Sequence, residues 1–167
     1  AHRRDRMASD GIAQALDAVL PRSPKSALDV FVRALGPKLT VTEDFGDDVF
    51  VGFALSAWLE VRGPEDVEGG LHANYELTQR FTAEFSIRPF LEQHTEATLR
   101  QLTAWAVDPS LHVRRLVSEG TRPRLPWAPR LRQFQADPTP VLALLELLKD
   151  DPELYVRRSV ANNLNDI

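Results

Sequence analysis

The sequence contains no cysteine, a single methionine and no apolar run that approaches the roughly 18 residues of a membrane span. Disulfide bonds and thiolate chemistry are therefore excluded, and nothing indicates secretion or membrane insertion. The chain also lacks a phosphate-binding glycine loop, a nucleophile elbow and a dinucleotide-binding fingerprint. Its histidines lie far apart, without the spacing of metal ligands, at His2, His72, His94 and His112. We therefore expect neither a metal nor a cofactor.

Charge is distributed unevenly along a chain of ordinary composition. The 167 residues are 43% apolar and 26% charged, which is typical of a globular protein, and we expect a single domain over residues 1–167. The segment His112–Arg132 carries six arginines and one acid, a local charge of +5, although the net charge is −4. Val41–Gly70 carries eight acids and one arginine, a local charge of −7. The first segment would attract a polyanion and the second would repel it, so the negative net charge of the whole chain does not exclude DNA binding.

Apolar residues recur at helical spacing through most of the chain, and proline or glycine marks most of the breaks between segments. This pattern predicts an all-α protein. We expect Ala1–Arg6 to be a cloning remnant or a poorly ordered end, because these residues precede the only methionine, Met7. We expect a helix before Pro21, a second from Pro24 to Gly36-Pro37, and a short extended piece at Leu39–Val41. A further helix is expected from Asp47 to about Val61, followed by a turn or helix start at Gly63–Gly70. The next helices expected are Leu71–Thr82, which continues or kinks into Ala83–Leu91, and Glu96–Val107.

Two segments match at a fixed offset of 43 residues, Asp108–Arg115 and Asp151–Arg158, and share the pattern D-P-x-L-x-V-R-R. Each follows an amphipathic helix. A period made of a helix, an Asp-Pro turn and a second helix is typical of HEAT repeats. Such repeats bury their apolar faces by stacking, so we expect HEAT-like helical repeats that form a curved α-solenoid. The chain stops within a second helix, at Ile167, and we expect it to be the N-terminal part of a longer solenoid.

Two groups of carboxylates and arginines share helical faces. Arg115 and Glu119 stand four residues apart, and Arg80, Glu84 and Arg88 form a second ladder with Glu84 between Phe81 and Phe85. A carboxylate held by arginines and aromatic rings suits the stabilisation of a developing cation. The plain alternative for the second ladder is a solvated stripe of ion pairs. For Arg115 and Glu119 it is a HEAT inter-repeat ladder, in which Asp108 pairs with an arginine of the next repeat. Against that alternative, the counterpart of Glu119 is Asn162.

Trp127 and Asp166 each have two interpretations. Trp127 lies in a Pro-Trp-Ala-Pro loop and is either a buried hydrophobic plug or a flat surface for a base or sugar. Asp166 follows Arg158 by eight residues and is either a frayed surface acid or a second functional carboxylate near the same helical face.

Three blocks of sequence together resemble the bacterial HEAT-like-repeat alkylpurine DNA glycosylases, and within them the AlkC branch. They are NYELTQRFTAEFSIRPFL (Asn74–Leu91), VRRLVSEGTRPRLPWAPRL (Val113–Leu131) and YVRRSVANNLNDI (Tyr155–Ile167). The stretch RLVSEGTRPRLPW is the most specific. The resemblance covers Asp47–Ile167 well and the first 46 residues loosely.

The resemblance implies a cytoplasmic, nucleoid-associated bacterial enzyme that hydrolyses the N-glycosidic bond of 3-methyladenine or similar cationic N-alkylated purines in duplex DNA. It implies catalytic roles for Glu119, Glu84 and Asp166. Binding to substrate or DNA is implied for Trp127, Arg115, Arg122, Arg124 and Arg158. No metal, cofactor or membrane is implied. The competing hypothesis is a non-catalytic HEAT module that binds damaged or branched DNA, or a protein partner.

Overall fold

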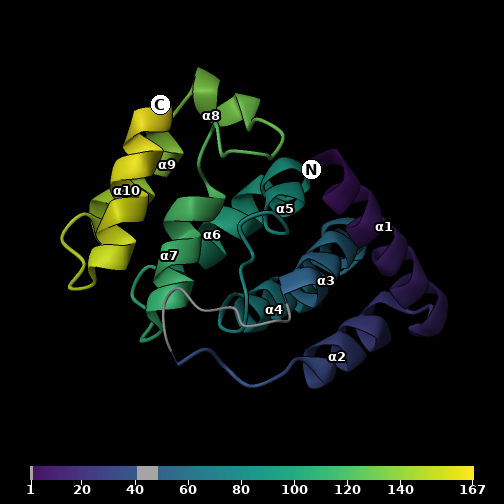
Figure 1. Cartoon of the computed structure of the whole chain (residues 1–167). Helices are drawn as coiled ribbons and strands as arrows, with labels where there is room; N and C mark the ends of the chain where they lie inside the picture. The colour runs from purple at the N-terminus through teal and green to yellow at the C-terminus, as the bar shows by residue number, and fades with distance from the viewer. Residues whose placement is uncertain (1, 41–48) are drawn as a thin grey trace. The chain divides into compact units, whose positions relative to one another are not determined.

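The computed structural model describes residues 2–40 and 49–167, with side chains from residue 11 onward, and these ranges contain helices and no strand (Figure 1). The all-α, helical-repeat prediction is confirmed. No helix within the described ranges is both long and apolar enough to pass through a bilayer. The elements are α1 (His2–Val19), α2 (Pro24–Ala34), α3 (Val49–Arg62), the short 3₁₀ helix η2 (Gly63–Glu65), α4 (Val67–Thr78), α5 (Arg88–Gln93), α6 (Thr95–Trp105), α7 (Leu111–Gly120), α8 (Arg132–Ala136), α9 (Thr139–Leu148) and α10 (Leu154–Asp166).

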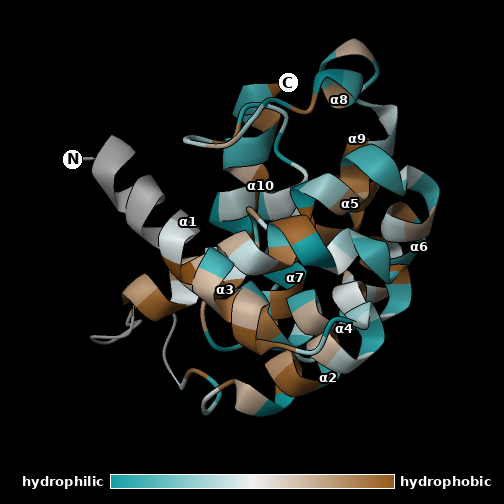
Figure 2. Ribbon diagram, turned by 90° about the vertical axis from the view of Figure 1, so that its right-hand side faces the viewer, coloured by the Kyte–Doolittle hydropathy of each residue, from teal (hydrophilic) through white to brown (hydrophobic). Residues whose placement is uncertain are grey.

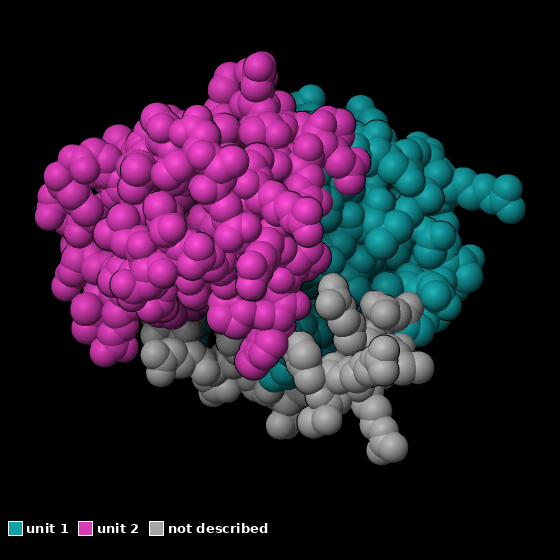
Figure 3. Space-filling view, turned by 90° about the horizontal axis from the view of Figure 1, so that it is seen from above, with its two compact units in different colours: residues 1–89 teal, residues 90–167 magenta. Residues whose placement is uncertain are grey.

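The chain forms two compact units, residues 1–89 and residues 90–167, which are coloured separately in Figure 3. In the first unit, α1 packs against α3, and α2 packs against α4. Phe31 of α2 stacks on Trp58 of α3 with ring centroids 5.2 Å apart. Asp66 caps α4, because its carboxylate accepts the Gly69 N–H at 3.2 Å. The expected helix start at Asp47, and Val41 of the expected extended piece, lie outside the described residues.

The segment Leu71–Thr82 was expected to continue or kink as helix into Ala83–Leu91, but the structure has a longer break, because residues 79–87 are not helical. α4 ends at Thr78, residues 84–87 form a turn, and α5 begins only at Arg88. The turn is tied to α4 by Ser86, whose hydroxyl donates to Asn74 Oδ1 at 2.7 Å inside the unit. Asn74 in turn donates to the Gly70 carbonyl of its own helix at 2.8 Å. These buried hydrogen bonds hold the turn against α4.

The second unit contains the two repeats, as the helix pairs α6–α7 and α9–α10. α7 packs against α10 and α9, and α6 packs against both α7 and α9. Matching positions 43 residues apart are buried in both repeats, including Leu102 with Leu145 and Val113 with Val156. The ribbon in Figure 2 alternates between brown and teal along these helices, as expected for helices that bury one face. The repeat expected from the sequence is therefore present in the fold.

Both Asp-Pro turns are built in the same way. Asp108 accepts the Ser110 N–H at 2.8 Å, and Asp151 accepts the Glu153 N–H at 2.9 Å. The first arginine of each Val-Arg-Arg folds back onto carbonyls of its own turn: Arg114 donates to Asp108 O at 2.8 Å, and Arg157 donates to Pro152 O at 2.9 Å. Each turn therefore fixes the first residues of the helix that follows it.

A bidentate ion pair joins the two repeats. Arg114 donates through Nε and Nη2 to the Asp151 carboxylate at 2.6 and 3.1 Å. Burial alone would raise the pKa of Asp151, but the hydrogen bonds from Arg114 and from the Glu153 N–H outweigh it and lower the pKa below its ordinary value. The alternative weighed for Arg115 and Glu119 was an inter-repeat ion pair of the opposite direction, from Asp108 to an arginine of the next repeat. That direction is wrong, because the arginine of the first repeat reaches the aspartate of the second.

Candidate active site

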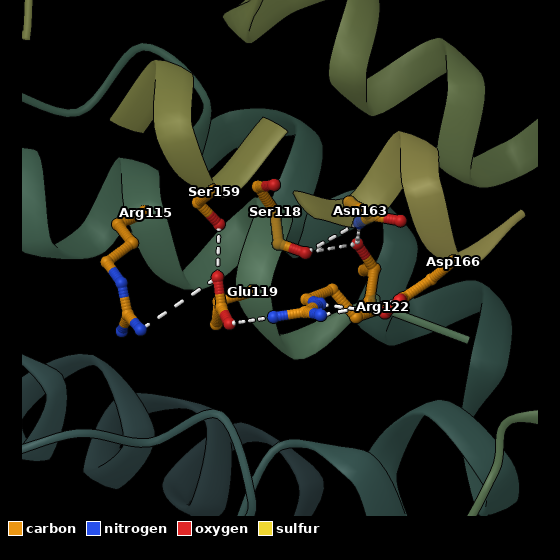
Figure 4. Close-up of polar contacts among 8 residues, drawn as sticks. Arg115, Ser118, Glu119, Arg122, Ser159, Asn163 and Asp166 are labelled. Atoms are coloured by element: carbon orange, nitrogen blue, oxygen red, sulfur yellow. Dashed lines mark hydrogen bonds and ion pairs between the residues drawn. The ribbon is translucent and has the colours of Figure 1, made fainter. Parts of the chain in front are cut away.

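Glu119 lies one residue before the end of α7 and is only 6% exposed. Both of its carboxylate oxygens are bound (Figure 4). Oε1 accepts from Arg122 Nη1 at 2.7 Å, and Oε2 accepts from the hydroxyl of Ser159 on α10 at 2.6 Å. Arg115 Nη2, one helical turn earlier on α7, lies 3.9 Å from Oε2. A buried carboxylate is thus surrounded by two guanidinium groups and one hydroxyl.

Arg122 joins Glu119 to Asp166. Its Nε donates to Asp166 Oδ2 at 2.7 Å and its Nη2 to Oδ1 at 3.3 Å, while Nη1 remains on Glu119. Burial alone would lower the pKa of Arg122, but the hydrogen bonds to Asp166 and Glu119 outweigh it and raise the pKa above its ordinary value. Arg122 therefore stays cationic between two carboxylates. Asp166 is not a frayed surface acid, because its side chain is only 14% exposed and is paired.

Local contacts between α7 and α10 position this group. Thr121 caps α7, and its hydroxyl donates to the Val117 carbonyl at 2.8 Å. Asn163 of α10 donates to the Ser118 carbonyl at 2.7 Å and to Thr121 Oγ1 at 3.1 Å. These buried hydrogen bonds hold the end of α7 against α10, so the backbone that carries Glu119 and Arg122 is fixed.

Arg115 also contacts an aromatic ring. Its guanidinium carbon lies 5.0 Å from the centre of the Tyr155 ring, which is within the range of a cation–π interaction. His112 packs edge-on against the same ring, with centroids 6.1 Å apart. Burial, followed by the positive charge of Arg115, lowers the pKa of His112 below its ordinary value. Burial and Arg115 therefore both favour the neutral form of His112.

Trp127 lies in the loop between α7 and α8 and is 71% exposed. Its backbone has a φ of 68°, a left-handed conformation that bulky residues seldom adopt. The buried-plug interpretation of Trp127 is therefore wrong. Arg124, in the same loop, and Arg158, on α10, are both exposed to solvent.

Glu84 lies in the first unit, in the turn that follows α4, and is partly exposed. The helical ladder expected for Arg80, Glu84 and Arg88 is wrong, because residues 79–87 are not helical. Arg80 instead pairs with Glu76 at 2.6 Å. Glu84 is carried by the turn that Ser86 anchors to Asn74, and this anchor sets its place on the unit. Among the side chains that the structure describes, no group of three or more His, Asp or Glu residues could hold a metal ion.

Comparisons with known proteins show what the fold and the sequence resemble. No protein-family model matches the sequence. The fold matches the DNA-bound structure of the Pseudomonas fluorescens alkylpurine DNA glycosylase AlkC, solved with an abasic-site analogue, at a TM-score of 0.69 and 33% identity over 97% of this chain. The chain is similar in fold to this glycosylase. A Bacillus subtilis (strain 168) protein, YhaZ, whose function is uncharacterized, is 47% identical over 116 residues, or 70% of the chain. The matches span 53% of the Pseudomonas chain and 32% of the Bacillus protein.

The site around Glu119 includes residues that sequence reasoning missed. Ser159, Asn163 and Tyr155 were not singled out. Ser159 contacts Glu119, Tyr155 contacts Arg115, and Asn163 binds Ser118 and Thr121 on either side of Glu119. A signal was available in the repeat. Ser159 and Asn163 lie on the buried face of α10, where the first repeat has Leu116 and Gly120. Polar residues on an otherwise apolar face indicate a buried polar partner.

Proposed function

We propose that this chain carries the active site of a DNA glycosylase that hydrolyses the N-glycosidic bond of cationic N-alkylated purines, such as 3-methyladenine, in duplex DNA. One observation carries the proposal: a buried glutamate, paired through one arginine with a second carboxylate, on a chain 33% identical to an AlkC alkylpurine glycosylase. That relative was solved with DNA containing an abasic-site analogue, and an abasic site is the product of such a reaction. Belonging to the AlkC branch is part of the proposal.

The proposed reaction needs little beyond electrostatic stabilisation and a positioned water. The bond from C1′ to the base nitrogen breaks, the base leaves with the electron pair, and a cationic base becomes neutral as it leaves. Positive charge then develops on the sugar. Water adds to C1′, and its proton passes to a carboxylate or to solvent. Glu119 is proposed to stabilise the sugar cation and to orient the water, assisted by Asp166 of the same unit. A catalytic role for Glu84, which lies in the first unit, stays a prediction from the sequence. Low exposure strengthens these interactions, because water screens a buried charge less than an exposed one.

The proposed DNA contacts are assigned from how far each side chain is exposed to solvent. Arg124 and Arg158 are exposed and suit phosphate binding, and Arg115 is partly buried beside Glu119, where it suits a phosphate near the lesion. The exposed ring of Trp127 suits contact with the altered nucleotide. Arg122 was expected to bind DNA as well. Its two ion pairs favour a different proposal, in which it is the shared counter-ion that keeps Glu119 and Asp166 in place.

A non-catalytic HEAT module that binds damaged or branched DNA, or a protein partner, is the second candidate. It is favoured by one observation: a network of Glu119, Arg122, Asp166 and Ser159 between two helices would also serve purely to lock them together. In that case the carboxylate charge would matter for stability and not for chemistry.

Substitution of Glu119 by glutamine separates the two candidates. Methylated duplex DNA is incubated with the wild type and with the variant, each in this chain and in a form extended past Ile167, and the released bases are separated and counted. Glu119→Gln should abolish release of 3-methyladenine and leave affinity for undamaged duplex within about twofold, since phosphate contacts dominate that affinity. Arg100→Gln, an exposed change on α6, is the matched control and should release base like the wild type. Equal release by Glu119→Gln and wild type would exclude the assigned role.

A further inference from the structure

Ser159 connects α10 directly to the Glu119 carboxylate. Its hydroxyl donates to Oε2 at 2.6 Å, and the serine itself is only 2% exposed. Hydrogen bonds of this length to a carboxylate are of the charge-assisted class. In Figure 4, Ser159 and Arg122 reach different oxygens of Glu119 from different directions.

Two contacts on two oxygens determine the orientation of the carboxylate plane. With Arg122 alone, only Oε1 would be held, and the group could rotate about that contact. Arg115 would then compete for Oε2, since its Nη2 already lies 3.9 Å away. A charge-assisted contact is about 2.8 Å long, so closing that distance moves the carboxylate by about 1 Å. A displacement of this size in a catalytic group can lower rates by as much as about 100-fold.

We infer that Ser159 is a positioning residue, which fixes the orientation of the Glu119 carboxylate and prevents Arg115 from drawing it out of place. This inference rests on the proposed function, because it assigns Ser159 a part in the chemistry that Glu119 performs. Ser159 touches neither the base nor the sugar in this role. Its effect on the reaction passes through Glu119.

Ser118 provides a matched control. Its hydroxyl is buried in the same helix interface, next to Glu119 in sequence, and has no hydrogen-bond partner within the described part of the chain. Ser118→Ala and Ser159→Ala remove the same atom from equally buried sites. Removal of a buried hydroxyl that lacks a partner is close to neutral for stability, so a difference between the two variants reports the contact with Glu119.

The experiment measures single-turnover release of 3-methyladenine from methylated duplex DNA, together with affinity for undamaged duplex and the melting temperature. Ser159→Ala should slow release by about 10- to 100-fold and leave DNA affinity within about twofold. Ser118→Ala should match the wild type in both. If Ser159→Ala proves unstable, Ser159→Cys is used, because a thiol is similar in size and only a weak donor, and the same loss is expected.

Three outcomes overturn the inference in distinguishable ways. Release by Ser159→Ala at the wild-type rate leaves the proposed function standing and removes the positioning role. Ser118→Ala could lose as much rate as Ser159→Ala, or Ser159→Ala could also bind DNA more weakly. Either result would mean that Ser159 contributes only to the packing of α7 on α10. Absence of release by the wild type, in this chain and in the extended form, refutes the proposed function, and the inference falls with it.

Discussion

Replacement of Asp151 by asparagine removes the charge that joins the two repeats of the second unit. Asp151 Oδ2 accepts from Arg114 Nε at 2.6 Å, while Oδ1 accepts from Arg114 Nη2 and from the Glu153 N–H. In Asp151→Asn, the new side-chain amide would keep one acceptor for the Glu153 N–H. Its NH₂ group would face the Nε–H of Arg114, so donor would meet donor where a charge-assisted bond had been.

The expected cost is about 3 kcal/mol in the free energy of unfolding. Breaking a buried ion pair by removing one partner costs about 3–5 kcal/mol. The Arg114 side chain is 12% exposed and that of Asp151 is 4%, so the pair is close to the buried limit. Arg114 also keeps its contacts to the Asp108 and Pro109 carbonyls at 2.8 and 3.1 Å. These remaining contacts place the estimate at the lower end of the range.

Urea unfolding followed by circular dichroism measures the effect. Asp108→Asn is the matched control, because Asp108 makes the same turn in the first repeat, and it should cost about 1 kcal/mol or less. The pKa of Asp151 is below its ordinary value of 3.8 in the folded protein. Its contribution is therefore present above about pH 4 and is lost as the pH falls through the folded pKa, so the deficit of Asp151→Asn should shrink in acid. Equal destabilisation by the two variants at pH 7 would refute the reasoning.

Three further results are expected. Trp127→Gly should change the free energy of unfolding by less than about 1 kcal/mol, because glycine adopts the positive φ without strain and this offsets the entropy that it adds to the unfolded chain. The same change should slow base release. Burial and then Arg115 lower the pKa of His112 from 6.5 in the folded protein. As the pH falls, His112 is therefore protonated at a higher pH in the unfolded chain than in the folded one. Wild-type stability should therefore fall as the pH drops below 6.5, and His112→Gln should weaken that fall in chemical unfolding. Arg124→Ala and Arg158→Ala should each reduce the log–log salt slope of DNA affinity by about 0.9, and unchanged slopes would exclude phosphate contacts there.

Local signals in the sequence were sufficient to predict the repeat. The Asp-Pro turn and the Val-Arg-Arg that follows it specify their own hydrogen bonds within six residues, as Arg114 and Arg157 both show. The spacing of apolar residues and the 43-residue offset also predicted the helix pairs of the two repeats, α6 with α7 and α9 with α10. The direction of the inter-repeat ion pair depends on how the repeats stack, which the local pattern does not contain.

Contacts between distant residues account for what the sequence did not reveal. Helix was expected to continue or kink through residues 79–87, but this stretch is not helical, and its Ser86 donates to Asn74, twelve residues away. Periodicity alone cannot detect such a bond. Likewise, Arg115 was expected as the partner of Glu119 because both lie on one helical face. The shorter contacts come from Arg122, beyond the end of α7, and from Ser159, forty residues away.

The most direct test of the central claim is to count both products of the reaction on methylated duplex DNA. The proposed hydrolysis predicts one released 3-methyladenine for each abasic site formed, with no strand cleavage by the protein itself, and loss of both products in Glu119→Gln. Tight binding to the methylated duplex with neither product, in this chain and in the form extended past Ile167, would contradict the account and favour the non-catalytic module.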